Sequence, residues 1–251
     1  MQLVVLVTKQ NIFAAMGQKK LIRFAAIKTF SNVLEYPENM QGQWGKHFNN
    51  LHPIVLELAC GRGEYTVGLS ALYPDKNFIG VDIKGNRMYI GAKKCLDENL
   101  RNAAFLRTQI ALLPNYFASA EVSEIWITFP DPQLRGSKAK KRLTHPQFLA
   151  LYQSILNADG YIHLKTDSPK LYQYTKMVIE LSGLILVEDI PDVYSNSNAP
   201  DFSIKTHYET LDIAGSKKIF YLKFQLSKSV DFSNEKVLQS LKEKEPYLPI
   251  S

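Results

Sequence analysis

The sequence has few cysteines and no long apolar run, and these absences exclude several classes of protein. Only Cys60 and Cys95 occur among 251 residues, without the spacing of a disulfide framework or a metal site, which is typical of the reducing cytoplasm. No apolar run approaches the roughly 20 residues of a membrane-spanning helix. The histidines show no metal-ligand spacing either: they are His47, His52, His145, His163 and His207. We therefore predict a cytoplasmic protein that has no metal and does not enter a membrane.

The chain also lacks internal repeats and a recognisable targeting signal. Met1–Val7 is apolar, but neither a basic leader nor a small-residue cleavage site accompanies it. The first fifteen residues fit no expected element, and Met16 is a second candidate start. We predict an extension without a folded role over 1–15, a single domain over 16–227 with a basic segment at 16–50, and a peripheral C-terminal tail over 228–251.

Acidic residues are missing from one stretch of a chain whose net charge is +6. No Asp or Glu lies between Pro132 and Ala158. The same stretch contains the basic residues Arg135, Lys138, Lys140, Lys141 and Arg142, and a second basic group consists of Lys19, Lys20, Arg23 and Lys28. A basic run is often only a solvated surface, but these groups also suit a polyanionic partner.

Hydrophobic patterning alternates between strands and helices. Strands are expected at 53–59, 77–82, 103–107, 124–128, 161–165 and 218–226, and helices at 64–72, at 86–99, from Thr144 and after Ser168. Thr144 and Ser168 each precede a proline closely and can cap a helix. Short links between alternating elements predict an α/β fold with a central, mostly parallel sheet and helices on both faces.

Two glycines follow the first expected strand, in Glu57-Leu-Ala-Cys-Gly61-Arg-Gly63. Glycine lets the backbone turn sharply and approach a ligand closely. Asp82, at the end of the second strand, can accept hydrogen bonds from ribose hydroxyls. Strand ends of an open α/β sheet meet beside the ligand. We therefore predict a nucleoside-type ligand here, the alternative being a plain turn with a solvated Asp82.

The residues around this turn disfavour a dinucleotide. The NAD fingerprint requires a third glycine, but this chain has Thr66 at that position, and Glu57 would repel a pyrophosphate. S-adenosylmethionine carries an ammonium, a sulfonium and a ribose but no phosphate, so it suits this environment better.

The fourth expected strand runs into Phe129-Pro130-Asp131-Pro132. Prolines on both sides restrict the backbone around Asp131, and the basic stretch follows at once. A carboxylate on a reaction rim with a basic arm suits a nucleic-acid substrate. Asp131 could stabilise positive charge on a methylated base, or orient the base or the cofactor ammonium. A proline turn capped by Asp131 is the structural alternative.

From about Gly17 to Phe224, the chain resembles the bacterial tRNA (guanine-N7-)-methyltransferases of the TrmB family. The motifs that carry this resemblance are LELACGRGEY (Leu56–Tyr65), GVDIKG (Gly80–Gly85), FPDP (Phe129–Pro132) with Lys141-Arg142-Leu143, Lys165-Thr166-Asp167, and Thr206-His-Tyr208-Glu209. The resemblance implies a Rossmann-like class I fold, dependent on S-adenosylmethionine (SAM), that methylates N7 of a guanine in the tRNA variable loop.

The expected site residues fall into three groups. The cofactor is expected to contact Glu57, Gly61, Gly63, Asp82, Gln109 and Asp131, with Asp131 also catalytic. The target nucleotide is expected, from the resemblance, to contact Arg135, Asp167, Thr206, His207, Tyr208 and Glu209. RNA phosphates are expected to contact Lys138, Lys140, Lys141 and Arg142, with the N-terminal basic group assisting.

Two positions depart from the family pattern. Gln109 replaces the usual acidic residue near the adenine, although its amide can still hydrogen-bond the adenine amino group. Gln133 stands where many relatives have Trp, so the resemblance supports no stacking contact there. A non-enzymatic RNA-binding module, an NAD-dependent oxidoreductase, and a methyltransferase acting on another RNA or guanine atom remain the competing hypotheses. The sequence does not indicate an oligomeric state.

Overall fold

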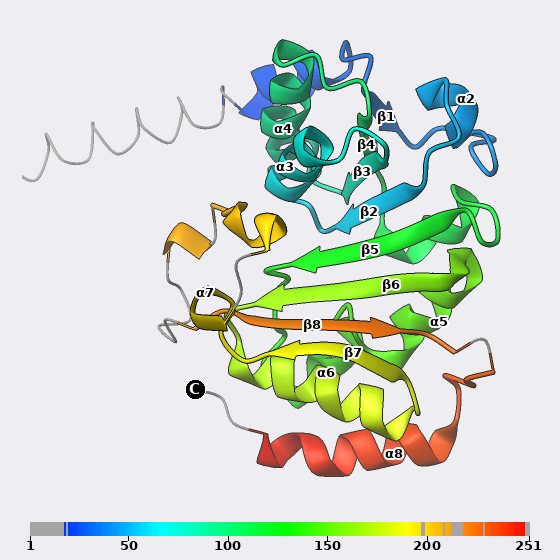
Figure 1. The fold of residues 1–251 in the computed structure, drawn as a ribbon, viewed down its shortest axis with the longest axis vertical. Helices are drawn as coiled ribbons and strands as arrows, with labels where there is room; N and C mark the ends of the chain where they lie inside the picture. The colour runs from blue at the N-terminus through cyan, green and yellow to red at the C-terminus, as the bar shows by residue number, and fades with distance from the viewer. Residues whose placement is uncertain are drawn as a thin grey trace, which may run out of the picture.

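A computed structural model describes residues 18, 20–196, 199–207, 209–211, 218–227 and 229–248. Eight strands form one sheet, with helices on both faces (Figure 1). The strands are β1 Val33–Glu35, β2 Ile54–Leu58, β3 Asn77–Asp82, β4 Ala103–Arg107, β5 Val122–Thr128, β6 Leu156–Thr166, β7 Ile185–Ile190 and β8 Phe220–Gln225. The α-helices are α2 Trp44–Phe48, α3 Glu64–Leu72, α4 Gly85–Asp97, α5 Pro146–Ile155, α6 Pro169–Leu181, α7 Val193–Asn196 and α8 Glu235–Lys244, and residues 20–27 are also helical. The 3₁₀-helices are η1 Ile110–Asn115, η2 Gly136–Lys141, η3 Pro200–Ser203, η4 Glu209–Leu211 and η5 Glu245–Tyr247.

The strand order is β1-β4-β3-β2-β5-β6-β8-β7. All pairs from β1 to β6 are parallel, and only β8 runs antiparallel to its two neighbours. The mostly parallel α/β fold expected from the sequence is therefore confirmed. The chain proceeds in opposite directions from β2 and from β5, which are adjacent. Their carboxyl ends form the crevice in which such sheets bind ligands, on the left in Figure 1.

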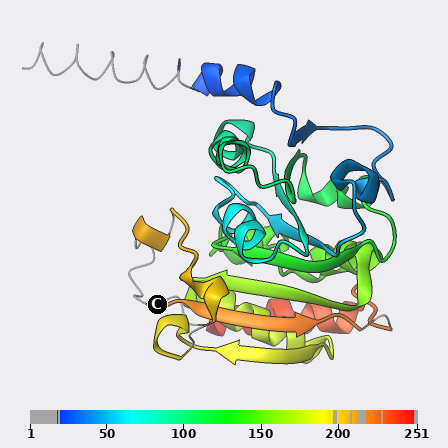
Figure 2. The same ribbon diagram turned by 45° about the horizontal axis from the view of Figure 1, so that its top comes forward.

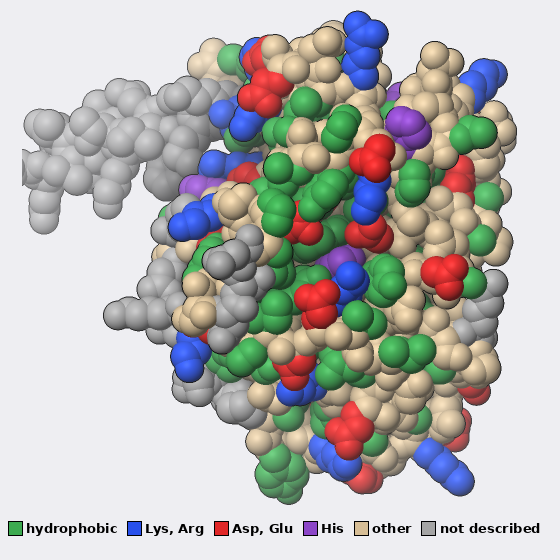
Figure 3. Space-filling view, viewed as in Figure 1, with side chains coloured by type: hydrophobic (Ala, Val, Ile, Leu, Met, Phe, Trp, Pro, Cys, Tyr) green, Lys and Arg blue, Asp and Glu red, His purple; other side chains and the backbone are tan. Residues whose placement is uncertain are grey.

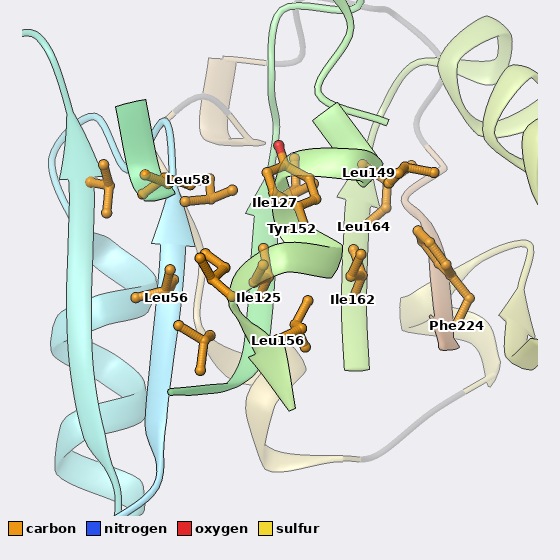
Figure 4. Close-up of a cluster of buried hydrophobic side chains, with 14 of the residues drawn as sticks. Leu56, Leu58, Ile125, Ile127, Leu149, Tyr152, Leu156, Ile162, Leu164 and Phe224 are labelled. Carbon is orange, nitrogen blue, oxygen red and sulfur yellow. The ribbon is translucent and has the colours of Figure 1, made fainter. Parts of the chain in front are cut away.

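The central strands are buried on both faces. Every residue of β2 is buried, as expected for a parallel strand covered by helices on both sides. One set of side chains, including Leu56, Ile125 and Leu164, packs against Leu149 and Tyr152 of α5 (Figure 4). This cluster is the largest apolar core in the described part of the chain.

The helices divide between the two faces of the sheet. Helices α2, α5 and α6 contribute to the main core, whereas α3 and α4 pack against the opposite face (Figure 2). The helix at 20–27 joins that side through its last residue, Ile27, which is buried with Met88 and Ala92 of α4. Among the described residues, no long helix covers that opposite face over β6, β8 and β7, where acidic and basic side chains lie among apolar ones (Figure 3). Ion pairs lie on this side of the sheet: Lys76 lies 2.6 Å from Glu124 of β5, and Lys223 of β8 lies 3.7 Å from Glu188 of β7.

Most expected elements are present, with five differences. Strands β1 and β7 and helix α2 were not expected, and β6 begins five residues before the predicted strand. Helix α5 is capped one residue later than expected. His145 is its N-cap, since Nδ1 accepts a hydrogen bond from the Gln147 amide, whereas the Thr144 hydroxyl pairs with Thr175 at 2.8 Å. Ser168 caps α6 as predicted.

The C-terminal segment, expected as a peripheral tail, contains helix α8 and packs onto the fold. Helix α8 packs against α6, and Phe232 and Leu241 are buried in the main core. Burial of these apolar side chains outweighs the charged character that suggested a tail. The predictions for residues 1–15 and for Tyr208 fall outside the described residues.

Candidate active site

A cavity of about 990 Å³ opens at the carboxyl ends of the parallel strands. Five of the expected site residues line it: Gly61, Asp82, Gln109, Asp131 and Asp167. They come from the ends of β2, β3, β4, β5 and β6 in turn. The sheet thus brings together residues that lie more than one hundred positions apart in the sequence, and the volume suits a nucleoside-sized ligand.

Asp82 lies in the cavity wall beside the glycine turn. Its Oδ2 accepts a hydrogen bond of 2.9 Å from the Gly61 amide, and its Oδ1 accepts one of 2.8 Å from the Lys84 amide. Gly61 has a φ of 57°, in the left-handed region that favours glycine. The carboxylate is therefore fixed by backbone donors, while its remaining lone pairs can accept from hydroxyl groups in the cavity.

Glu57 and Gly63, both expected as cofactor contacts, lie beside the cavity-lining residues of the glycine turn but not in the lining itself. Glu57 is 3% exposed, and its Oε2 accepts from both the amide and the hydroxyl of Thr66, at 2.7 and 2.6 Å. The Thr128 hydroxyl donates to its Oε1 at 3.2 Å. A Cβ at Gly63 would lie 2.4 Å from the Phe105 ring. Both residues thus pack beneath the glycine turn, where Glu57 binds Thr66 at the start of α3.

Burial raises the pKa of Glu57 to about 7, although the hydrogen bonds from Thr66 oppose this effect. The unfolded chain retains an ordinary carboxyl pKa of 4.5, so folding takes up a proton between these values. We expect the free energy of unfolding to fall as the pH rises from about 4.5 to about 7, by on the order of 3 kcal/mol, and to level off above. Glu57→Gln cannot ionise and should lose this dependence. Denaturant titrations across that range measure it, and parallel pH profiles of both proteins would contradict it.

The loop around Asp131 has an unusual backbone. Phe129 and Gln133 both have a φ of 47°, a left-handed conformation that disfavours side chains with a Cβ. Hydrogen bonds hold both ends: the Phe129 amide donates to the Lys165 carbonyl at 2.8 Å, and the Gln133 amide donates to Asp131 Oδ1 at 3.0 Å. The Asp131 side chain is exposed at the cavity rim. Strain of this kind persists where the surroundings fix the backbone, and often at functional sites.

Thr206 and Glu209 form a reciprocal cap beside the cavity, although the cavity lining includes neither of them. The Thr206 hydroxyl accepts from the Glu209 amide at 3.2 Å, and Glu209 Oε2 accepts from the Thr206 amide at 3.4 Å. This is the capping-box pattern, which the Thr-x-x-Glu spacing could have indicated. The His207 amide donates to Glu64 Oε1 at 3.2 Å, which ties this segment to the start of α3.

Lys165 joins several parts of the site, and its environment was not expected from the sequence. Its side chain is fully buried, and Nζ lies 3.2 Å from Glu209 Oε2 and 3.3 Å from the Ile204 carbonyl. The ammonium also lies 5.4 to 5.6 Å from the ring centres of Tyr65, Phe129 and Tyr194. Burial lowers the pKa of Lys165 and raises that of Glu209. One buried cation therefore connects the glycine turn, the Asp131 loop and the 204–209 segment.

The basic run following Asp131 forms η2 and does not act as a uniform surface. Arg135, Lys138, Lys140 and Lys141 are exposed, but the Arg142 side chain is fully buried. Its Nη2 lies 2.6 Å from Glu245 Oε1, and its guanidinium lies 4.3 Å from the centre of the Tyr174 ring. The structure contradicts the expectation that Arg142 contacts phosphate, because a buried, paired guanidinium cannot reach RNA.

Comparison with known proteins identifies the family. A family model described as "Putative methyltransferase" matches residues 50–222. A tRNA (guanine-N(7)-)-methyltransferase of Bacteroides thetaiotaomicron is 48% identical over 84% of this chain and 87% of its own length. That of Porphyromonas gingivalis is 50% identical over 80% of this chain and 86% of its own length.

The chain belongs to the tRNA (guanine-N7-)-methyltransferase family. Solved structures agree on the fold alone. A 30S ribosomal A1408 methyltransferase from an uncultured bacterium has a TM-score of 0.55 at 16% identity, covering 75% of this chain and 95% of that one. The 16S rRNA methyltransferase KamB has a TM-score of 0.54 at 12% identity, covering 72% of this chain and 93% of that one. The chain is therefore a Rossmann-like methyltransferase.

None of the helices among the described residues has the length and apolar character needed to cross a membrane. Within the same part of the chain, no three His, Cys, Asp or Glu side chains gather as metal ligands would.

Proposed function

We propose that this family member transfers a methyl group from S-adenosylmethionine to N7 of a guanine in the variable loop of tRNA. One observation carries the proposal. A single cavity joins the Gly61–Asp82 turn to Asp131, and an exposed basic arm begins four residues after Asp131. A nucleoside-sized cavity, a carboxylate and an exposed basic surface thus meet at one sheet edge.

The residues of the cavity fit this cofactor. Asp82 would accept hydrogen bonds from its ribose hydroxyls, and Gly61 allows close approach of the turn. Gln109 lies on the same wall, where its amide oxygen can accept from the adenine amino group. The bound cofactor supplies an electrophilic methyl group on a positively charged sulfur.

The protein's task is alignment more than acid–base chemistry. Guanine N7 already carries a lone pair, so no base is needed before attack. Holding N7 in line with the methyl carbon and sulfur can contribute up to about 7–11 kcal/mol. Methylation leaves the base positively charged, and Asp131 at the rim of the cavity would stabilise that charge as it develops.

The competing functions are disfavoured by specific contacts. A dinucleotide site would need glycine at position 66, whereas Thr66 donates two hydrogen bonds to Glu57. A module that only binds RNA would not require a cavity lined by Gly61 and Asp82. Such a module would bind tRNA but not S-adenosylmethionine. We also propose a cytoplasmic location, where unmodified tRNA is available.

The exposed lysines of η2 should determine how strongly salt weakens tRNA binding. We expect replacement of Lys138, Lys140 and Lys141 with Ala to lower tRNA affinity and to reduce the slope of log affinity against log salt by about 3, since each phosphate contact contributes about one. Binding titrations at several salt concentrations measure this slope. Affinity for S-adenosylmethionine serves as the control, because these lysines lie outside the cavity lining. Coincident slopes for variant and wild type would refute the assignment.

Labelled methyl transfer tests the proposed reaction. Unmodified tRNA is incubated with the protein and labelled S-adenosylmethionine, then digested to nucleosides. The label is expected in N7-methylguanosine. Label in another nucleoside would retain the methyl transfer but refute the N7 assignment, and tRNA binding without any label would favour the binding module.

A further inference from the structure

The guanidinium of Arg142 holds the backbone that directly follows Asp131. Its Nε donates to the Pro132 carbonyl at 3.1 Å, and its Nη2 donates to the Gln133 carbonyl at 2.9 Å. The 134–141 segment contains the exposed lysines of η2. Arg142 directly follows this segment, and its hydrogen bonds join the end of the segment to the residues that precede it. One planar group thus connects the start of the basic arm to its end.

These bonds act on a strained part of the loop. Gln133 has a φ of 47°, and its amide donates to Asp131 Oδ1 at 3.0 Å. A residue with a Cβ adopts this conformation only where its surroundings fix it. Because Arg142 binds the carbonyl of Gln133 while the amide of Gln133 binds Asp131, displacement of Arg142 would alter the position of the carboxylate.

The C-terminal segment supplies the charge that keeps Arg142 in place. Glu245 follows α8 and lies 2.6 Å from Arg142 Nη2, with only 7% of its side chain exposed. The guanidinium also lies against Tyr174 of α6, 4.3 Å from the centre of the tyrosine ring. A buried cation without a paired anion would be strongly unfavourable, so Arg142 depends on α8 for its position.

We propose that Arg142 is a positioning residue for Asp131, and that Glu245 at the end of the C-terminal helix holds it there. The inference rests on the proposed function, in which Asp131 acts on the target base. The basic run accordingly divides into two roles. Its lysines face solvent and RNA, whereas its last arginine faces inward and sets the geometry of the reaction loop. The C-terminal helix thereby contributes to catalysis without contacting either substrate.

Two variants test whether Glu245 and Arg142 position the Asp131 loop. Arg142→Lys retains the charge but cannot donate to both carbonyls in one plane, and Glu245→Gln retains the volume but removes the counter-charge. In both we expect the single-turnover rate, at saturating tRNA and S-adenosylmethionine, to fall between about tenfold and a hundredfold. Hydrogen exchange at the Gln133 amide, measured without cofactor or tRNA, should accelerate. The salt dependence of tRNA binding should not change.

Matched controls separate this role from RNA binding. Lys141→Ala, next to Arg142 but exposed, should reduce the salt slope by about 1 and leave Gln133 exchange unaltered. Glu243→Gln lies two positions before Glu245 on the exposed side of α8 and should change neither property. Circular dichroism confirms folding first. If Arg142→Lys does not fold, Glu245→Gln decides the question by the same readouts.

The outcomes separate the two hypotheses. A normal rate with a reduced salt slope in Arg142→Lys would overturn the inference and return Arg142 to the RNA surface. Unchanged Gln133 exchange in folded variants would overturn it as well. Failure of the wild-type protein to methylate tRNA would refute the proposed function instead. Hydrogen exchange at the Gln133 amide would still test whether Arg142 and Glu245 position the loop.

Discussion

Replacing Asp131 with Asn is expected to lower the single-turnover methylation rate by about 10²–10³-fold, with tRNA affinity retained. Asn matches Asp in shape, and its Oδ1 can still accept the 3.0 Å hydrogen bond from the Gln133 amide. The loop therefore keeps its geometry and loses only its charge. Since that charge opposes the positive charge developing on the methylated base, its removal acts on the transition state more than on binding.

Rapid-mixing single-turnover assays, together with equilibrium tRNA binding, measure the two effects separately. Asp159→Asn is the matched control, because Asp159 is exposed and lies away from the cavity. An unchanged rate in Asp131→Asn would remove Asp131 from the catalytic centre. A loss of tRNA affinity equal to the loss of rate would assign it to ground-state binding instead.

Replacing Lys165 with Met should destabilise the protein by about 3–5 kcal/mol, because it leaves the Glu209 carboxylate buried without its cation. The two groups lie 3.2 Å apart, with side chains 0% and 6% exposed. Glu209 can take up a proton at low pH, and burial already raises its pKa. The loss of stability should therefore be smaller at about pH 5 than at about pH 8.

A second substitution tests whether the unpaired charge is the cause. Lys165→Met combined with Glu209→Gln should recover part of the lost stability, since it removes the uncompensated carboxylate. Lys93→Met, which breaks an exposed pair with Asp97 on α4, should leave stability near that of the wild type. Chemical denaturation at two pH values measures all three variants. No recovery in the double variant would show that Lys165 acts through its packing among the aromatic rings.

The local sequence pattern was sufficient to predict the position of a residue when that position depends only on the residue's own strand or turn. The positions of Asp82 and Asp131 followed from strand ends and from the parallel topology, and the structure places both on one cavity. Strand β7, by contrast, is an exposed edge without the buried pattern that marks the central strands. Its existence depends on pairing with β8, and no local signal contains that information.

Long-range pairing explains the largest misassignment within the basic run. Lys141 and Arg142 are neighbours in one charged stretch, and nothing in their local sequence distinguishes an exposed side chain from a buried one. Arg142 is buried because Glu245 lies 103 positions away in sequence but within 2.6 Å in space. Lys165 likewise pairs with Glu209, 44 positions away. Such roles become visible only once the fold brings the partners together.

Borohydride–aniline cleavage of tRNA, which cuts the chain at N7-methylguanosine, tests the central claim most directly. Unmodified tRNA is incubated with S-adenosylmethionine and either the wild-type protein or the Asp131→Asn variant, and the fragments are sized. We expect a single cut in the variable loop with the wild-type protein and almost none with the variant at equal times. Methyl incorporation without that cut, or a cut elsewhere in the tRNA, would contradict it.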